Sequence, residues 1–138
     1  MQTTNDVVFE HPAVAVVGRV MFTVIFFLSG LTHFTSMSGY VALMPAAIPF
    51  RTFWVIISGV VELIGATMIV TNRYPRLGGW LIVLFLIPVT ITVHGVGVVT
   101  APDAQMQGIQ ASFFLKGVAM TGTALLITQL GVRRSPGS

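Results

Sequence analysis

The feature that most constrains this chain is a set of four long apolar segments with almost no charged side chains. Only 8% of its 138 residues are Asp, Glu, Lys or Arg, whereas an ordinary soluble domain carries about 25%. A soluble fold needs a charged surface. A bilayer removes that need, because lipid accepts apolar side chains on the outside of a protein. The sequence therefore predicts one small domain embedded in a membrane.

The lengths of the apolar segments agree with this interpretation. We expect membrane spans over residues 13–34, 52–71, 77–96 and 112–130. Each contains about 20 residues, or roughly 30 Å of helix, which matches the thickness of a bilayer core. The predicted fold class is all-α, a membrane-spanning four-helix bundle. Residues 1–12 and 131–138 are predicted to be polar tails.

The connections between the spans differ in length. Residues 72–76 predict a tight turn that makes the second and third spans antiparallel neighbours. Residues 97–111 are predicted to be the longest loop. Pro88 is expected to kink the third span, because proline has no N–H to donate. Within residues 37–51 we expect a short helix at the membrane interface, lined on one side by Tyr40, Val41, Met44 and Ile48.

The basic residues predict the orientation of the chain. Arg73, Arg76, Arg133 and Arg134 fall on the side of the two termini, whereas Arg51 falls on the other side. Because loops rich in Lys and Arg stay in the cytoplasm, both termini are expected to be cytoplasmic. The predicted location is the inner (cytoplasmic) membrane.

Two compositional features exclude classes of function. The chain has no cysteine, which excludes disulfides, thiolate catalysis, iron–sulfur clusters and cysteine zinc sites. The net charge of +3 comes from basic residues spread along the chain. No basic patch with interleaved aromatic residues is present, so we expect no nucleic-acid partner.

The informative residues are the polar ones inside the spans: Arg19, His33, Glu62, His94 and Lys116. A charge at the centre of a membrane helix costs about 2.5–3.5 kcal/mol, so such residues usually face the interior and find partners there. We expect them to form a buried polar network or a ligand-binding site. No nucleophile and base pair and no metal site is evident, so we expect no catalytic activity from the chain alone.

Helical spacing predicts which face of each span turns inward. The predicted inward stripes are Arg19, Thr23, Phe26, Gly30 and His33 in the first span, Ser58, Gly59, Glu62, Gly65 and Ala66 in the second, Thr90 and His94 in the third, and Lys116, Met120 and Thr123 in the fourth. Small and polar residues on such stripes let helices approach closely.

The depth of these residues predicts a pocket. His33, His94 and Lys116 lie near the non-cytoplasmic ends of their predicted spans, and Glu62 lies about ten residues deeper, roughly 15 Å. Arg19 approaches from the cytoplasmic side. The arrangement predicts a polar pocket that opens away from the cytoplasm.

A purely structural interpretation stays open for each of these residues. Glu62 and Arg19 would then form an ion pair that locks the first two spans together. Lys116 would extend to the membrane surface, and both histidines would make interfacial hydrogen bonds.

Short motifs in the same order give the chain a family resemblance. Arg19 precedes the run Phe26-Phe27-Leu28-Ser29-Gly30-Leu31-Thr32-His33-Phe34, and the second span contains Gly59-Val60-Val61-Glu62-Leu63-Ile64-Gly65. The third span begins with Arg76-Leu77-Gly78-Gly79 and contains His94. Over residues 15–130 the chain resembles the DoxX family of small four-helix membrane proteins. The family's fourth span usually reads Phe-x-Lys-Asn, whereas this chain has Phe114-Leu115-Lys116-Gly117.

The resemblance implies a redox context, because the family is similar to a small subunit of a thiosulfate-oxidising, quinol-linked enzyme. Our first hypothesis is a non-catalytic accessory subunit of a larger membrane complex. It would contact other membrane subunits as well as lipid. The alternative is a self-contained module that binds or transports a quinone or another lipid. A third hypothesis is bis-histidine haem ligation by His33 and His94, but two histidines alone are weak evidence and we do not expect haem.

Overall fold

The computed structural model of the chain describes residues 11–130, and every regular element in this part is a helix. Four helical stretches are long and apolar enough to cross a membrane: Pro12–Thr35, Arg51–Val70, Pro75–Thr100 and Ala104–Thr128. The predicted all-α, membrane-spanning fold is therefore confirmed. The cytoplasmic location of the termini stays a prediction, and Arg133 and Arg134, on which it partly rests, lie outside the described residues.

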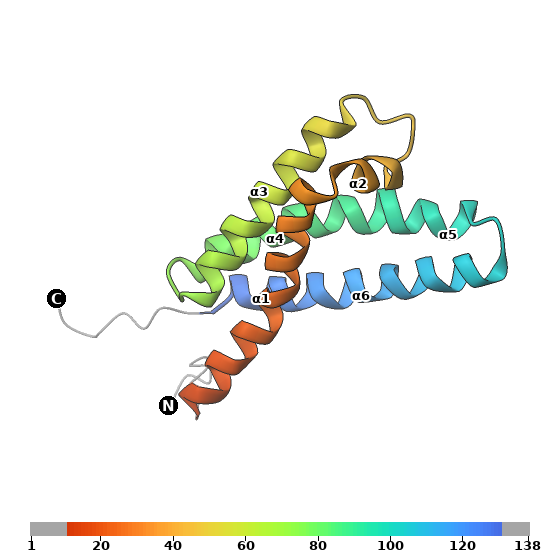
Figure 1. Cartoon of the computed structure of the whole chain (residues 1–138). Helices are drawn as coiled ribbons and strands as arrows, with labels where there is room; N and C mark the ends of the chain where they lie inside the picture. The colour runs from red at the N-terminus through yellow and green to blue at the C-terminus, as the bar shows by residue number, and fades with distance from the viewer. Residues whose placement is uncertain (1–10, 131–138) are drawn as a thin grey trace.

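Seven helical elements make up the described chain (Figure 1). They are α1 (Pro12–Thr35), α2 (Met37–Leu43), α3 (Arg51–Val70), α4 (Pro75–Val89), the π-helix η1 (Thr90–Gly95), α5 (Val96–Thr100) and α6 (Ala104–Thr128). The segment α4–η1–α5 is continuous and forms the third span.

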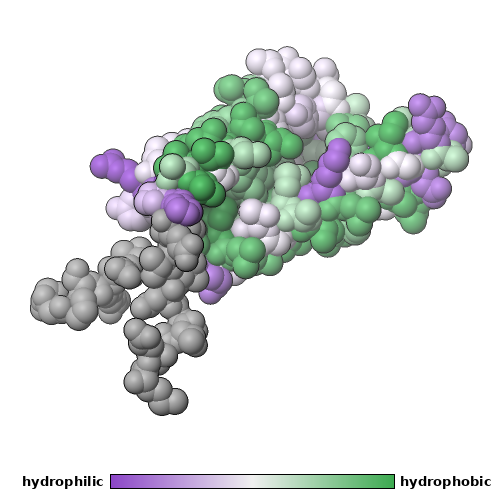
Figure 2. Space-filling model, turned by 90° about the horizontal axis from the view of Figure 1, so that it is seen from below, coloured by the Kyte–Doolittle hydropathy of each residue, from purple (hydrophilic) through white to green (hydrophobic). Residues whose placement is uncertain are grey.

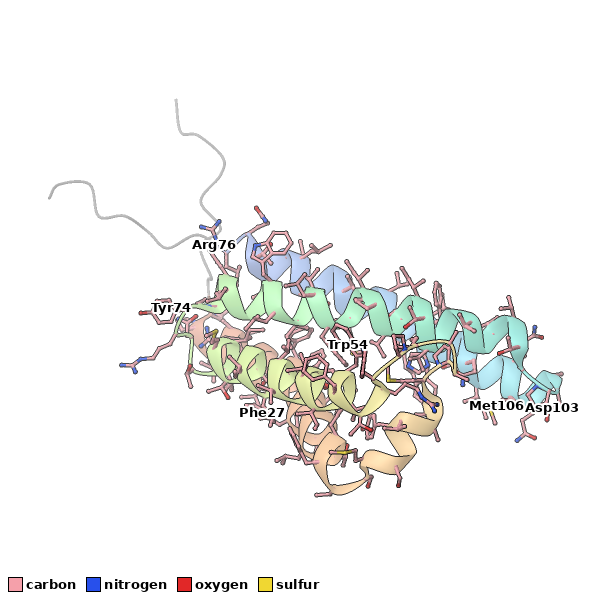
Figure 3. All side chains as sticks on the ribbon, turned by 90° about the horizontal axis from the view of Figure 1, so that it is seen from above. Phe27, Trp54, Tyr74, Arg76, Asp103 and Met106 are labelled. Carbon is pink, nitrogen blue, oxygen red and sulfur yellow. The ribbon has the colours of Figure 1, made fainter. Side chains whose placement is uncertain are left out.

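The four spans pack as a row in the order α1, α3, α4, α6. Figure 3 shows α1 and α6 on opposite sides of the central α3 and α4, although α1 crosses in front of α6 in Figure 1. Along the length of the helices, Arg76 and Tyr74 lie at one end of the molecule, and Met106 and Asp103 lie at the other. On the face drawn in Figure 2, hydrophobic side chains cover most of the middle and hydrophilic ones concentrate toward the ends.

Glycines bring neighbouring helices of the row into close contact. A Cβ atom on Gly59 of α3 would lie 2.8 Å from the Cβ of His33 and 3.2 Å from the carbonyl oxygen of Gly30, both in α1. Between α3 and α4, a Cβ on Gly78 would lie 2.7 Å from the carbonyl oxygen of Gly65. Close backbone approach through small residues is the usual way that membrane helices associate.

A hydrophobic core fills the centre of the row. Its buried members are Phe26, Ala66, Ile69, Ile82, Val83, Leu86, Ala124 and Ile127. They come from α1, α3, α4 and α6, so all four spans contribute to one core.

The predicted loop over residues 97–111 is wrong. Val96–Thr100 is helical as α5, and α6 already begins at Ala104. The Asp103 side chain caps α6, because its Oδ1 accepts a hydrogen bond of 2.8 Å from the backbone N–H of Met106. The glutamines of this segment lower its hydropathy without breaking the helix, so hydropathy alone places the start of the fourth span too late.

The connection between α3 and α4 is short, as predicted. α3 ends at Val70 and α4 begins at Pro75, a residue favoured in the first turn of a helix. The Nε of Arg76 donates a hydrogen bond of 2.8 Å to the carbonyl oxygen of Thr128. This bond joins the start of α4 to the end of α6.

A short helix lies within residues 37–51, as predicted. α2 covers Met37–Leu43, and Met44 follows as its C-cap. Tyr40, Val41, Met44 and Ile48 are all half-buried, whereas most of the residues between them are exposed. The four residues therefore share a half-buried side as expected, although Met44 and Ile48 lie beyond the last residue of the helix.

The third span changes its helical form after Pro88. The π-helix η1 begins at Thr90, and the hydroxyl of Thr92 donates a hydrogen bond of 2.7 Å to the carbonyl oxygen of Pro88. Proline disrupts the regular α-helical bonding around it, and short π segments often occur at functional sites. His94 lies within this segment.

The glycine contact between α1 and α3 leads to a prediction. Gly59→Ala is expected to destabilise the fold by about 1–3 kcal/mol, the usual cost of overpacking. The matched control is Gly122→Ala in α6, where nothing lies within 4 Å of the added Cβ and helix propensity rises by up to about 1 kcal/mol. Thermal unfolding of both variants in one detergent measures the difference. Equal stabilities would contradict the proposed contact.

Candidate functional site

The structure brings His33 and Glu62 together at the contact between α1 and α3. The Nδ1 atom of His33 lies 3.4 Å from Oε1 of Glu62. His33 is only 4% exposed and Glu62 is 0% exposed. The pair forms next to Gly59, one turn before Glu62, because this glycine leaves room for the His33 side chain.

Neighbouring groups fix the orientation of the His33 ring. Its Nδ1 lies 2.8 Å from the carbonyl oxygen of Ser29, which can only accept a hydrogen bond, so we assign a proton to Nδ1. The ring stacks on Tyr40 of α2 with centroids 3.9 Å apart, and it meets the ring of Phe85 of α4 edge-on at 6.2 Å. The Tyr40 hydroxyl lies 2.6 Å from the hydroxyl oxygen of Thr32.

The carboxyl group of Glu62 is the least satisfied polar group of this cluster. Within residues 11–130, neither of its oxygens has a hydrogen-bond partner. The 3.4 Å approach of His33 allows electrostatic attraction but exceeds an ordinary hydrogen bond. Buried polar side chains nearly always have partners, so an exception at the centre of a span needs an explanation.

The expected ion pair between Glu62 and Arg19 is not formed. Glu62 pairs with His33 instead. Arg19 lies fourteen residues before His33 on the same helix, about 21 Å away. The Arg19 Nε is buried and has no hydrogen-bond partner in the described part of the chain.

The expected difference in depth between His33 and Glu62 is also wrong. The two side chains meet although Glu62 lies in the middle of α3 and His33 lies in the last turn of α1. α1 ends at Thr35, and α2 with residues 44–50 provides the remaining connection to Arg51. The end of α1 therefore lies beside the middle of α3.

A second polar cluster joins η1 to α6. The Nδ1 of His94 lies 2.9 Å from Oε1 of Gln110. The His94 ring stacks on Phe113 with centroids 5.3 Å apart, and the Nζ of Lys116 lies 5.3 Å from the centroid of the same ring. A cation this close to an aromatic ring is attracted to its face. His94 is half-buried, whereas Phe113 and Lys116 are exposed.

The predicted inward stripe of the fourth span is wrong for two of its three residues, whereas the third, Met120, packs against the core. Lys116 and Thr123 are exposed, and the buried residues of α6 are Gly117, Ala124, Ile127 and Thr128. The inward face thus combines two small residues, a large apolar residue and a threonine, and it carries no charge. Because α6 begins at Ala104, Lys116 lies twelve residues from each of its ends and not one turn from its start.

The five predicted site residues therefore occupy three places. His33 and Glu62 form one cluster, His94 and Lys116 belong to a second, and Arg19 lies apart. The two histidines of the haem hypothesis are in different clusters. Sequence reasoning did not place Ser29, Tyr40, Gln110 or Phe113 in these clusters. Ser29 lies one helical turn before His33, and Phe113 lies one turn before Lys116. Helical spacing was therefore the sequence signal that could have placed Ser29 and Phe113 beside the site residues.

The two best-formed surface hollows lie outside these clusters. One is lined by residues 72–77 at the turn between α3 and α4. The other is lined by Val41 and residues 50–53 near the start of α3. Glu62 itself is completely enclosed. In residues 11–130, no three metal-ligating side chains gather in one place.

The buried pair leads to a prediction about stability. His33→Leu is expected to cost about 3–5 kcal/mol, because it leaves Glu62 without its partner. Combining it with Glu62→Leu is expected to recover part of that loss. The coupling energy is expected to be about 0.5–3 kcal/mol in a double-mutant cycle. Unfolding free energies of the four proteins in detergent give this number.

The control for this cycle uses the other histidine. His94→Leu and Glu62→Leu belong to different clusters, so their effects are expected to add within about 0.3–0.5 kcal/mol. The same additivity between His33 and Glu62 would show that their contact contributes nothing.

Comparison with known proteins agrees with this architecture. A family model named DoxX matches residues 14–95, which is more than half of the 138-residue chain. The match covers α1, α2, α3, α4 and η1, and it ends before α6, so the motif around Lys116 lies outside it. No curated protein matches the chain, and no solved structure does. The chain belongs to the DoxX family of membrane proteins.

Proposed function

We propose that this protein is a non-catalytic accessory subunit of a larger, redox- or quinone-linked complex of the inner (cytoplasmic) membrane. The observation that carries the proposal is the exposed face of α6. This helix has the lowest mean hydropathy of the four spans, and its central residue is the exposed Lys116.

The exposed residues of α6 suit a protein contact better than lipid. Together with Lys116, its exposed small and polar residues include Gly108, Ser112, Ala119, Gly122 and Thr123. Small residues let a neighbouring helix approach closely. A charged side chain within a span is costly in lipid, and such residues usually face other protein or a water-filled cavity. A neighbouring subunit on this face would cover Lys116.

The redox link in this proposal rests on the family. The DoxX resemblance connects the chain to a small subunit of a quinol-linked enzyme. The absence of cysteine rules out thiol exchange by the chain itself. The redox chemistry would therefore belong to the partner subunits.

Purification from native membranes tests the accessory role. The tagged protein is expected to co-purify with a stoichiometric set of redox subunits in mild detergent. Lys116→Leu is expected to reduce their recovery about tenfold or more, because a loss of 1.4 kcal/mol corresponds to a factor of ten in affinity. Quantitative mass spectrometry and native electrophoresis measure the recovery and the size of the complex.

A lipid-facing variant provides the control. Leu28 in α1 is 63% exposed and lies on the helix at the opposite side of the row. Leu28→Ala is expected to leave recovery unchanged. Elution of the unmodified protein alone, or as a homo-oligomer, would contradict the accessory role.

The second cluster supports a second candidate function, a self-contained module that binds a quinone or another lipid. His94, Gln110 and Lys116 offer hydrogen-bonding and cationic groups next to the exposed ring of Phe113. A quinone headgroup is flat and accepts hydrogen bonds at its carbonyl oxygens, which matches these groups. The lipid-facing position of the ring would give such a headgroup direct access from the bilayer.

Bound quinone in the purified protein tests this candidate. Extraction and chromatography are expected to find a quinone in the unmodified protein and much less in His94→Ala and Lys116→Leu, which remove two groups of this cluster. Unchanged occupancy in both variants would rule the candidate out.

A further inference from the structure

We propose that Glu62 and His33 form a proton-binding site that holds one exchangeable proton in the membrane interior. The proposal is independent of the accessory role, since it concerns the contact between α1 and α3 and not the exposed face of α6. It assigns a ligand, the proton, to a cluster whose shape and charge admit little else.

The geometry of Glu62 carries the first step. Its side chain is 0% exposed, and both carboxyl oxygens lack a hydrogen-bond partner within residues 11–130. The nearest titratable group is the imidazole of His33, whose Nδ1 is 3.4 Å away. Neither the hollow lined by residues 72–77 nor the one lined by Val41 and residues 50–53 reaches the pair. Because the carboxyl group of Glu62 is 0% exposed, a proton is small enough to bind it without movement of the helices.

The count of charges carries the second step. The count starts from a neutral imidazole and an ionised carboxylate, which together carry one negative charge. Adding one proton makes the pair neutral. Either Glu62 is then protonated beside a neutral His33, or both groups are ionised and attract each other. Without the added proton, the site keeps an unpaired negative charge. With two added protons, it keeps an unpaired positive charge. An unpaired buried charge is strongly disfavoured, so the single-proton state is favoured.

The surrounding helices supply no other charge at the pair. On α1, the next ionisable side chain is Arg19, about 21 Å from His33 along the helix. On α4, Phe85 meets His33 edge-on, and residues 77–93 contain no ionisable side chain. On α2, the titratable group is Tyr40, which stacks on His33. Glu62 is the sole ionisable residue of α3 after Arg51 at its start.

The side facing α2 provides the shortest route for exchange. The half-buried Tyr40 covers the His33 ring, and its hydroxyl lies 2.6 Å from that of the exposed Thr32. Protons would come from water at this surface and return to it. Loading adds one proton and one positive charge to the pair, and unloading removes both.

Isotope labelling can count the proton, because the chain has only two glutamates, Glu10 and Glu62, and three histidines, His11, His33 and His94. The full-length protein is reconstituted in lipid with carboxyl ¹³C-glutamate and ring ¹⁵N-histidine. Solid-state NMR then reports the protonation of both groups in one sample at neutral pH. Glu10→Gln, His11→Gln and His94→Gln identify the remaining signals and are expected to leave those of the pair unchanged.

Two results would support the proposal at neutral pH: a protonated Glu62 with a neutral His33, or an ionised Glu62 with a cationic His33. An ionised Glu62 beside a neutral His33 would overturn it, as would a protonated Glu62 beside a cationic His33. Raising the pH is expected to release one proton from the pair, seen as a change of the Glu62 or His33 signal.

Conservative variants keep the test meaningful if larger changes disturb folding. Glu62→Gln has nearly the shape of a protonated glutamate, so its fold is expected to be retained. In this variant His33 is expected to be neutral at neutral pH. In His33→Gln, Glu62 is expected to keep the proton alone. An ionised Glu62 in His33→Gln would contradict the proposal even if the unmodified protein were ambiguous.

Discussion

The close approach of α1 and α3 at Gly30 and Gly59 is the contact on which the polar interior depends. Because neither residue has a side chain, the two backbones come near enough for the Cβ of His33 to lie against Gly59. One turn further along α3, Glu62 then meets the imidazole. In lipid there is little hydrophobic gain from bringing two apolar helices together, so packing and polar contacts must hold them. The glycine contact and the buried pair therefore depend on each other. If α1 and α3 lay further apart, His33 and Glu62 would both be buried without their contact.

The inward faces of α1 and α3 were predictable from the sequence because small and polar residues recur there at helical spacing. Thr23, Phe26, Gly30 and His33 are buried, as are Gly59, Glu62, Gly65 and Ala66. The inward face of α6 was not predictable in the same way, since apolar, small and polar residues alternate around this helix without a clear stripe. Lys116 drew attention by its charge, but the residues that pack are Gly117 and Ala124. The partner of Glu62 was also not predictable. Arg19 and His33 share one stripe of α1, and sequence spacing does not say which of them lies level with Glu62.

The third span shows how one local irregularity shapes the second cluster. After Pro88 the helix widens into η1, which carries both Thr90 and His94. Thr90 is buried and its hydroxyl has no hydrogen-bond partner among the described residues. Its side chain fills the space beside Gly117, where a Cβ would lie 2.9 Å from Cγ2 of Thr90. The family pattern that the fourth span resembles, Phe-x-Lys-Asn, has Asn at the position of Gly117. In this chain the glycine allows η1 and α6 to approach directly, and the hydrogen-bonding capacity that an amide would offer to Thr90 is absent.

The row arrangement separates the two polar clusters in position. Glu62 and His33 lie between α1 and α3, enclosed and without contact to the exposed surface of α6. Lys116 and Phe113 lie on the helix at the other edge of the row. A subunit or ligand bound at α6 would therefore not need to displace the pair, and the pair can change its protonation without altering the exposed face. What the two clusters share is the central unit of α3 and α4, which packs through Gly65 and Gly78. Any coupling between them would have to pass through a shift of these two tightly packed helices, which is costly because their backbones are already in contact.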